Sequence, residues 1–163
     1  MFEAETLTLA QAVLETCRAR NWRLATAESC TGGLVVGALT AIAGSSDVVE
    51  RGFVTYSNEA KSELLGVPPE IITAHGAVSA ETAAAMAQGA IARAPVDLAI
   101  SNSTRPTGFV AVAPPGPAMP VTGLARRDGA CRTERRVFAG NRTAVRQAAM
   151  QEALGLLEAE TRN

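Results

Sequence analysis

Residues 22–42 read WRLATAESCTGGLVVGALTAI, and the pattern in this segment decides the fold. Trp22, Leu24 and Thr26 alternate with the residues between them, as in a short β-strand, and this strand runs into Ser29. The apolar run after the two glycines, residues 34–42, is typical of a largely buried helix. A strand that breaks at a glycine-containing loop and continues as a helix predicts an α/β fold.

The rest of the chain repeats this order of elements. We expect further helices over 7–17, from 58 to the prolines at 68 and 69, over 79–94, and from about 143 onward; further strands are expected over 48–56, 96–101 and 131–138. Residues 102–122 have no sustained period and hold five of the chain's eight prolines, so only 108–113 could extend. The pattern predicts one domain over residues 1–163, a three-layer α/β/α sandwich around a central mixed or mostly parallel sheet.

Composition and charge limit the classes of function. Lys and Arg total 15 and Asp and Glu total 16, so the net charge of −1 provides no broad footprint for a nucleic acid or an anionic membrane. The acidic, amphipathic N-terminus does not resemble a signal peptide, and no apolar run approaches the ~20 residues of a membrane span. Three scattered cysteines and one histidine predict neither a disulfide framework nor a zinc site. We therefore expect a cytoplasmic protein without a metal.

The loop after the first strand is the main candidate for chemistry. Ser29 could attack a carbonyl carbon, while backbone N–H groups near Thr31 and Gly32, at the start of a helix, receive the resulting oxyanion. Such amides can equally cradle a phosphate. In the alternative interpretation, Ser29 or Thr31 caps the helix and the glycines permit a tight turn. Cys30 is a rival nucleophile, although its small neighbours also suit a buried, inert thiol.

A second candidate constellation is Tyr56-x-Asn58-x-x-Lys61, at the end of the next strand. A serine nucleophile needs a base, and Lys61 can serve if burial and a nearby cation lower its pKa toward neutrality. Tyr56, the chain's only tyrosine, could relay the proton. In the alternative, Lys61 is solvated and Asn58 caps the following helix.

Two further features carry weaker signals. His75 precedes a helix and could act in acid–base chemistry, but the sequence shows no acidic partner for it and favours a histidine placed in a turn. Arg142 and Arg146 put two guanidinium groups beside the start of the last helix, where they could hold a substrate phosphate. A solvated basic face is the alternative.

Several motifs, in order, resemble the CinA C-terminal domain family. They are Ala27-Glu28-Ser29-Cys30-Thr31-Gly32-Gly33, Gly44-Ser45-Ser46, the segment from Arg51 to Lys61, and His75-Gly76-Ala77-Val78-Ser79. The resemblance covers residues 7–101 and returns from Gly123 to the end. It implies a nicotinamide-nucleotide amidase, which hydrolyses the carboxamide of nicotinamide mononucleotide to nicotinate mononucleotide and ammonia.

Residue by residue, the resemblance implies that Ser29 is the acyl-enzyme nucleophile and that Lys61 and Tyr56 activate it. The amides around Thr31 and Gly32 would be the oxyanion donors, and Arg142, in Gly140-Asn141-Arg142, would face the substrate phosphate. The resulting set for oxyanion and substrate binding is Cys30, Thr31, Gly32, Gly33, Asn58 and Arg142. The family resemblance implies no metal, no cofactor and a homo-oligomer, for which the Ala-rich helix 80–94 offers a close-packing surface.

One segment departs from the family pattern. After the central strand the family has Val-Thr-Gly-Ile-Ala-Gly-Pro, a glycine run and Lys-Pro-Val-Gly, whereas this chain reads NSTRPTGFV over residues 102–110. Since the matching flanks are separated by the usual number of residues, one hypothesis is a pair of compensating frame shifts between 102 and 122. A genuine segment leaves two alternatives to the leading function: a catalytically silent nucleotide-binding module, or an amidase for another small carboxamide.

Overall fold

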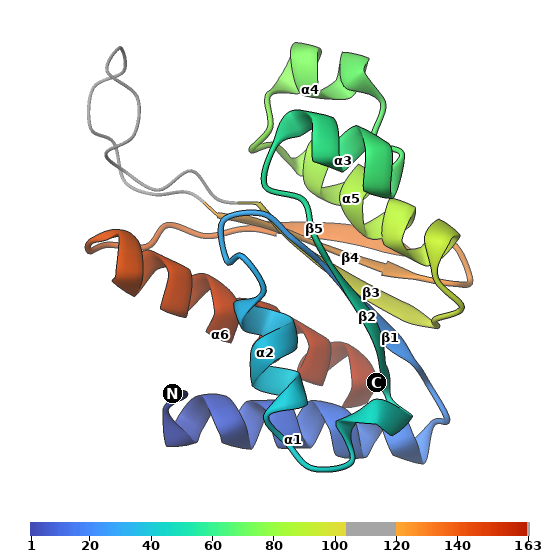
Figure 1. The fold of residues 1–163 in the computed structure, drawn as a ribbon, viewed down its shortest axis with the longest axis vertical. Coiled ribbons are helices and arrows are strands. Elements are labelled where there is room, and N and C mark those ends of the chain that lie inside the picture. Colours follow the sequence, from blue (N-terminus) through green and yellow to red (C-terminus); the bar gives the residue numbers. More distant parts are fainter. Residues whose placement is uncertain (104–119, 163) are drawn as a thin grey trace.

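The computed structural model describes residues 1–103 and 120–162 and is drawn in Figure 1. Its helices are α1 (Ala4–Ala19), α2 (Leu34–Thr40), α3 (Asn58–Leu65), α4 (Pro69–His75), α5 (Ala80–Arg93) and α6 (Arg142–Arg162), with a short 3₁₀ turn at Ser45–Asp47. Its strands are β1 (Leu24–Glu28), β2 (Val49–Val54), β3 (Leu98–Ser103), β4 (Val121–Arg126) and β5 (Cys131–Arg135). The strand, loop and helix expected over 22–42 are confirmed.

The five strands form one mixed sheet in the order β2-β1-β3-β4-β5. β1 pairs in parallel with β2 and β3, whereas β4 and β5 continue the sheet antiparallel. All five residues of β1 are buried, as expected for an interior strand covered on both faces. The prediction of a central mixed sheet is therefore confirmed.

Helices cover both faces of the sheet (Figure 1). α1, α2 and α6 lie on one face, and α3, α4 and α5 lie on the other. Because successive side chains of a strand point to opposite faces, Leu24 packs in the cluster under α1 and α6, while Ala25 and Ala27 pack in the cluster under α5. The three-layer α/β/α sandwich is confirmed.

Small residues let α5 lie close to its neighbours within the chain. A Cβ at Gly89 would overlap the carbonyl oxygen of Leu65 in α3, and a Cβ at Gly123 in β4 would overlap the carbonyl oxygen of Ala83 in α5. The alanines of the buried face of α5, such as Ala83 and Ala87, pack against the sheet. Packing within this chain thus accounts for the small residues at these positions.

Two elements were not expected from the sequence. α4 ends at His75, where only a turn before the next helix was expected, and β4 begins inside the segment that shows no period. The strand expected over 96–101 runs from Leu98 to Ser103 instead, and Asn102 and Ser103 are paired with β4. The expected extension at 108–113 and most of the segment that departs from the family pattern lie outside the described residues.

Candidate active site

The candidate site lies where β1 and β2 end. Because the two strands are parallel, their carboxyl ends meet at one edge of the sheet, and the segments after Glu28 and Val54 lie side by side. α2 follows β1 on one face of the sheet and α3 follows β2 on the other (Figure 1). In α/β sheets, ligands bind at the carboxyl ends of strands where successive crossovers lie on opposite faces. Ser29 occupies this position.

Lys61 reaches Ser29 from α3. Its Nζ lies 3.2 Å from Ser29 Oγ and also donates to the carbonyl oxygens of Thr55, at 3.0 Å, and Ser57, at 3.4 Å. The Lys61 side chain is 1% exposed and Ser29 is 9% exposed. Nζ thus faces three oxygen atoms; once the amine is neutral, its two N–H bonds can stay on the carbonyl oxygens while its lone pair faces the Ser29 hydroxyl. The alternative of a solvated Lys61 is therefore wrong.

Burial lowers the pKa of Lys61 below its ordinary value, because charge is disfavoured away from water. Cys30 and Glu59 act in the opposite direction, and the desolvation effect is the largest. A lysine with a lowered pKa, in hydrogen-bond contact with a serine hydroxyl, is the arrangement of a nucleophile with its base.

The start of α3 differs from the expectation for Asn58. Ser57 is the N-cap residue, and its Oγ accepts a hydrogen bond from the Ala60 N–H at 3.0 Å. Asn58 is the first residue of α3 and is exposed. The interpretation of Asn58 as the cap is wrong, and its side chain lies exposed in the first turn of α3.

Glu28, the last residue of β1, holds the start of α2. Its carboxylate is 1% exposed and accepts hydrogen bonds from the Gly33, Val35 and Val36 N–H groups and from the Thr26 hydroxyl, at 2.9 to 3.1 Å. A carboxylate at a helix N-terminus also interacts favourably with the helix dipole. The sequence reading gave Glu28 no role, although an acid at the end of an otherwise apolar strand was a signal.

These contacts narrow the set of amides that can receive an oxyanion. The Gly32 N–H donates to the Ser29 carbonyl oxygen at 3.1 Å, and the Gly33 N–H is held by Glu28. Both glycines have positive φ, +60° and +94°, as the tight turn requires. Thr31 is fully buried, and within the described part of the chain its Oγ1 has no hydrogen-bond partner. Of the expected oxyanion donors, Gly32 is thus already engaged in the turn.

The Cys30 thiol is buried beside β3 and has a hydrogen-bond partner there. Cys30 is 3% exposed and its thiol donates to Asn102 Oδ1 at 3.4 Å, while the Asn102 Nδ2 group donates to the Ala149 carbonyl oxygen in α6 at 3.1 Å. These bonds connect the loop to β3 and α6. The geometry favours the structural interpretation of Cys30 over the nucleophilic one.

Tyr56 and Arg142 meet at the surface beside the loop. Arg142, the first residue of α6, donates from Nη2 to the Tyr56 hydroxyl at 2.8 Å. Tyr56 is 61% exposed. Ser29 Oγ is instead in contact with the side chain of Lys61. The structure therefore brings Tyr56 to Arg142, a placement that suits ligand binding better than proton relay to Ser29.

Arg146 lies one turn further along α6 and contacts the loop of residues 29–33 between β1 and α2, which holds the candidate nucleophile and is called the nucleophile loop below. Its Nε donates to the Cys30 carbonyl oxygen and its Nη2 donates to the Thr31 carbonyl oxygen, both at 2.9 Å. Two of its nitrogens are thus engaged with the backbone, so the expected use of Arg146 as a phosphate ligand is not favoured. Its contact with the loop was not expected from the sequence.

His75 lies at the end of α4, in the layer opposite α2 and α6, with its Nδ1 3.6 Å from Glu81 Oε1. The structure therefore does not bring His75 to Ser29. No group of three or more His, Cys, Asp or Glu side chains within residues 1–103 and 120–162 is placed to hold a metal ion. No described helix is both long and apolar enough to cross a membrane.

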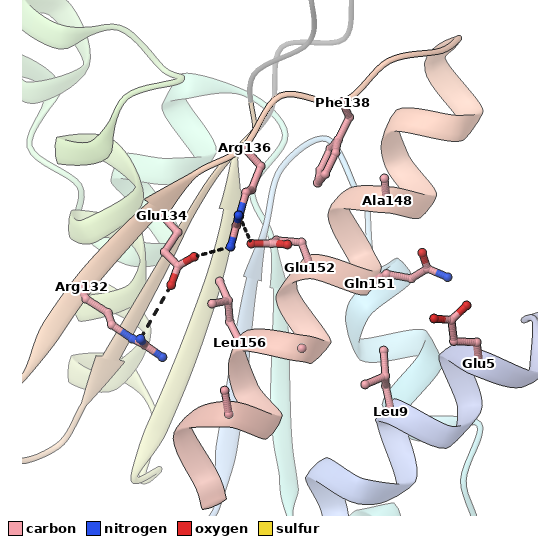
Figure 2. A pocket seen from close by; sticks show the side chains of 12 residues that line it. Glu5, Leu9, Arg132, Glu134, Arg136, Phe138, Ala148, Gln151, Glu152 and Leu156 are labelled. Carbon is pink, nitrogen blue, oxygen red and sulfur yellow. Dashed lines mark hydrogen bonds and ion pairs between the residues drawn. The ribbon is translucent and has the colours of Figure 1, made fainter. Parts of the chain in front are cut away.

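A separate groove lies between α1, β5 and α6 (Figure 2). Leu9, Leu156 and Phe138 contribute apolar surface, and ion-paired side chains border it, among them Arg136, which donates to Glu152 at 2.9 Å. None of Ser29, Lys61 and Arg142 lines it. The groove is therefore distinct from the candidate active site.

Comparison with known proteins gives consistent matches. The profile of the CinA C-terminal domain matches residues 6–161. Nicotinamide-nucleotide amidohydrolase PncC of Escherichia coli is 43% identical over 159 residues, which are 96% of this chain and 95% of that protein. A CinA-like protein of Syntrophobacter fumaroxidans is 46% identical over 91% of this chain, but the match spans only 35% of that longer protein.

Solved structures agree with the sequence matches. The competence/damage inducible protein CihA of Agrobacterium tumefaciens superposes with a TM-score of 0.89 and 38% identity, covering 100% of this chain and 99% of that one. A CinA superfamily protein of Escherichia coli superposes with a TM-score of 0.82 and 33% identity over 98% of this chain and 94% of that one.

Proposed function

Because the chain belongs to the family of the CinA C-terminal domain, we propose that it is an amidohydrolase of nicotinamide mononucleotide, forming nicotinate mononucleotide and ammonia. The similarity to PncC over nearly the whole length of both chains supports the substrate class. The distance of 3.2 Å between Lys61 Nζ and Ser29 Oγ is the single observation that supports the chemistry.

In the proposed first step, Ser29 Oγ attacks the carboxamide carbon and its proton passes to Lys61 Nζ. The tetrahedral intermediate then collapses as protonated Lys61 returns the proton to the amide nitrogen, the C–N bond breaks, and ammonia leaves. Water attacks the acyl-enzyme and gives one proton to Lys61 Nζ; as the C–Oγ bond breaks, Lys61 passes this proton to Ser29 Oγ, and the product acid releases its remaining proton to solvent as the carboxylate.

For the intermediate's oxyanion, we propose the Thr31 N–H as the principal donor, with Cys30, Gly32 and Gly33 shaping the loop around it. Gly32 and Gly33 already use their N–H groups inside the turn, which supports the choice of Thr31. A donor preorganised toward the developing charge can contribute about 10²-fold to 10³-fold in kcat.

For the substrate phosphate, we propose Arg142 with Tyr56 and Asn58. Arg142 stands at the N-terminus of α6, where the first turn carries no acidic residue. A cation at this end of a helix opposes the helix dipole, so a bound anion would relieve an unfavourable arrangement. Arg142 and Tyr56 are already joined by a hydrogen bond at the surface, and Asn58 lies exposed nearby in sequence at the start of α3.

The test is ammonia release from nicotinamide mononucleotide by the wild-type chain and by Ser29→Ala, with Ser45→Ala as a control away from Lys61. Turnover by the wild type and by the control, and its loss in Ser29→Ala, supports the proposal. Nucleotide binding in a calorimeter without turnover identifies the silent binding module. Preference for another compound in a panel of carboxamides identifies an amidase for another small carboxamide.

Two expectations from the sequence stay predictions, namely a cytoplasmic location and a homo-oligomer. Ala83, Ala87 and Ala90 of α5 are buried within the chain, whereas Ala92 is exposed. Sedimentation equilibrium measures the oligomeric state directly.

A further inference from the structure

The nucleophile loop is held by one side chain from the far end of the sequence. Arg146 donates from Nε to the Cys30 carbonyl oxygen and from Nη2 to the Thr31 carbonyl oxygen, both at 2.9 Å. A guanidinium presents its donors in a rigid plane, so two bonds to successive carbonyl groups fix their relative orientation. These charge-assisted bonds are stronger than those between neutral groups.

The two carbonyl groups determine where two N–H groups point. A peptide unit is planar, and in the trans form its N–H is directed opposite to its C=O. The described chain contains no cis peptide. The Cys30 carbonyl shares its plane with the Thr31 N–H, and the Thr31 carbonyl shares its plane with the Gly32 N–H. By drawing both oxygens toward itself, Arg146 therefore directs the two N–H groups away from α6.

The guanidinium of Arg146 lies directly against the turn. Gly32 has a φ of +60°, and a Cβ at this position would lie 3.4 Å from Arg146 Nη2, in contact with the guanidinium. Arg146 lies one turn from Arg142, whose hydrogen bond goes to Tyr56 after β2. One face of α6 thus contacts both of the loops that border Ser29.

We propose that Arg146 is a positioning residue that clamps the peptide planes of the nucleophile loop and so orients the Thr31 N–H for the oxyanion. This inference rests on the proposed amidase function. Hydrogen bonds polarise one another. The positively charged Arg146 guanidinium, bonded to the Cys30 carbonyl oxygen, therefore also makes the N–H of the same peptide unit, that of Thr31, a stronger donor. Arg146 touches neither substrate nor reacting atoms in this role.

The kinetic test compares Arg146→Met and Arg146→Lys with Arg127→Lys. Arg127 is a matched control because its Nε also donates to a backbone carbonyl, that of Val96, at 2.9 Å, and Val96 precedes the opposite end of β3. In Arg146→Met, kcat for nicotinamide mononucleotide is expected to fall about 100-fold, as for loss of one oxyanion donor, while KM changes by less than about threefold. Arg146→Lys keeps the positive charge but loses the planar pair of donors, so its kcat is expected to lie between those of wild type and Arg146→Met.

Product binding and chemical rescue separate positioning from ligand binding. The dissociation constant of nicotinate mononucleotide, measured by calorimetry, is expected to stay within about threefold of wild type in Arg146→Met. Added guanidinium is expected to raise the kcat of Arg146→Ala, because it can occupy the vacated position between the two carbonyl groups. An unchanged kcat in Arg146→Met, or a rise in KM and product dissociation constant without a fall in kcat, overturns the proposal.

Amide hydrogen exchange of the free protein provides a readout that needs no turnover. In Arg146→Met, exchange at the Gly32 N–H, which donates to Ser29, is expected to accelerate at least about tenfold, with no change in Arg127→Lys. Unchanged exchange at Gly32 overturns the clamp. If the wild type fails to hydrolyse nicotinamide mononucleotide, the proposed function fails, and the exchange rates still decide whether Arg146 holds the loop.

Discussion

The Glu28 carboxylate offers the sharpest test of how the nucleophile loop is built. In Glu28→Gln, the single amide oxygen can keep the Gly33 and Val35 N–H groups, and the NH₂ group then faces the Val36 N–H and the Thr26 hydroxyl. The hydroxyl can rotate and accept, but the Val36 N–H cannot, so one backbone donor loses its acceptor. An unsatisfied buried donor costs about 1–3 kcal/mol, and the retained bonds weaken because the acceptor is no longer charged.

Cheaper desolvation of a neutral amide offsets part of this cost. We expect Glu28→Gln to lower the free energy of unfolding by about 2–3 kcal/mol, which corresponds to a Tm decrease of about 5–10 °C for a chain of this size. Urea unfolding followed by circular dichroism measures the free energy. Glu70→Gln is the matched control, since Glu70 is an exposed acid in the first turn of α4 and loses only a dipole interaction, about 0.3–1 kcal/mol. Equal stabilities of the two variants would refute the role assigned to Glu28.

Four further predictions concern the site and the packing of α5. The pH profile of kcat/KM is expected to rise as Lys61 loses its proton, with a midpoint below the ordinary lysine pKa of about 10.4, because burial lowers the pKa of Lys61; a midpoint at or above that value contradicts the assignment. Between the lowered pKa of Lys61 in the folded protein and about 10.4, its pKa in the unfolded chain, the unfolded chain binds more protons than the folded one. The free energy of unfolding of wild type is therefore expected to rise relative to that of Lys61→Met as pH increases through this range, as measured by urea unfolding at several pH values. Tyr56→Phe is expected to raise KM about 3-fold to 10-fold with kcat nearly unchanged, as for the loss of one hydrogen bond in binding; a fall in kcat alone restores Tyr56 as a proton relay. Gly89→Ala is expected to lower the Tm despite the better helix propensity of alanine, because its Cβ would overlap the Leu65 carbonyl oxygen, whereas Gly155→Ala in α6, with nothing within 4 Å, is expected to stabilise by about 0.5–1 kcal/mol; the same sign for both in thermal melts contradicts the packing described here.

The contact between Ser29 and Lys61 was accessible from the sequence because each partner follows a strand signal. The alternation before Ser29 and the apolar run before Tyr56 predict two strands, and parallel neighbours bring their carboxyl ends together. Lys61 lies one turn into the helix that follows, within reach of that edge. The spacing and the resemblance together therefore predict which residues meet, and the structure adds that burial accompanies the contact.

Contacts that depend on the turn of the loop were not accessible. Glu28 receives N–H groups from residues 33, 35 and 36 only because two glycines with positive φ turn the chain back over the strand end. Arg146 meets Cys30 across 116 positions of sequence, and the hydrogen bond between Arg142 and Tyr56 joins residues 86 positions apart. No local pattern encodes such contacts between elements, since they follow from how α6 lies against the sheet.

The two unexpected elements have separate physical causes. Gly123 weakens the strand signal of β4, but the close approach of the Ala83 carbonyl oxygen leaves no room for a side chain there. α4 is only seven residues long, and its first residue is Pro69. Proline at the first helical position is a known start signal, so α4 was predictable from the sequence, whereas β4 was not.

The central claim is that Ser29, activated by Lys61, forms an acyl-enzyme. Intact-protein mass spectrometry of enzyme quenched in acid during turnover of nicotinamide mononucleotide tests it most directly. The account predicts an adduct of the mass of the nicotinate mononucleotide acyl group on a peptide that contains Ser29, and no adduct in Ser29→Ala or Lys61→Met. Turnover without any adduct in wild type and with full activity in Ser29→Ala, or an adduct on Cys30, would contradict it.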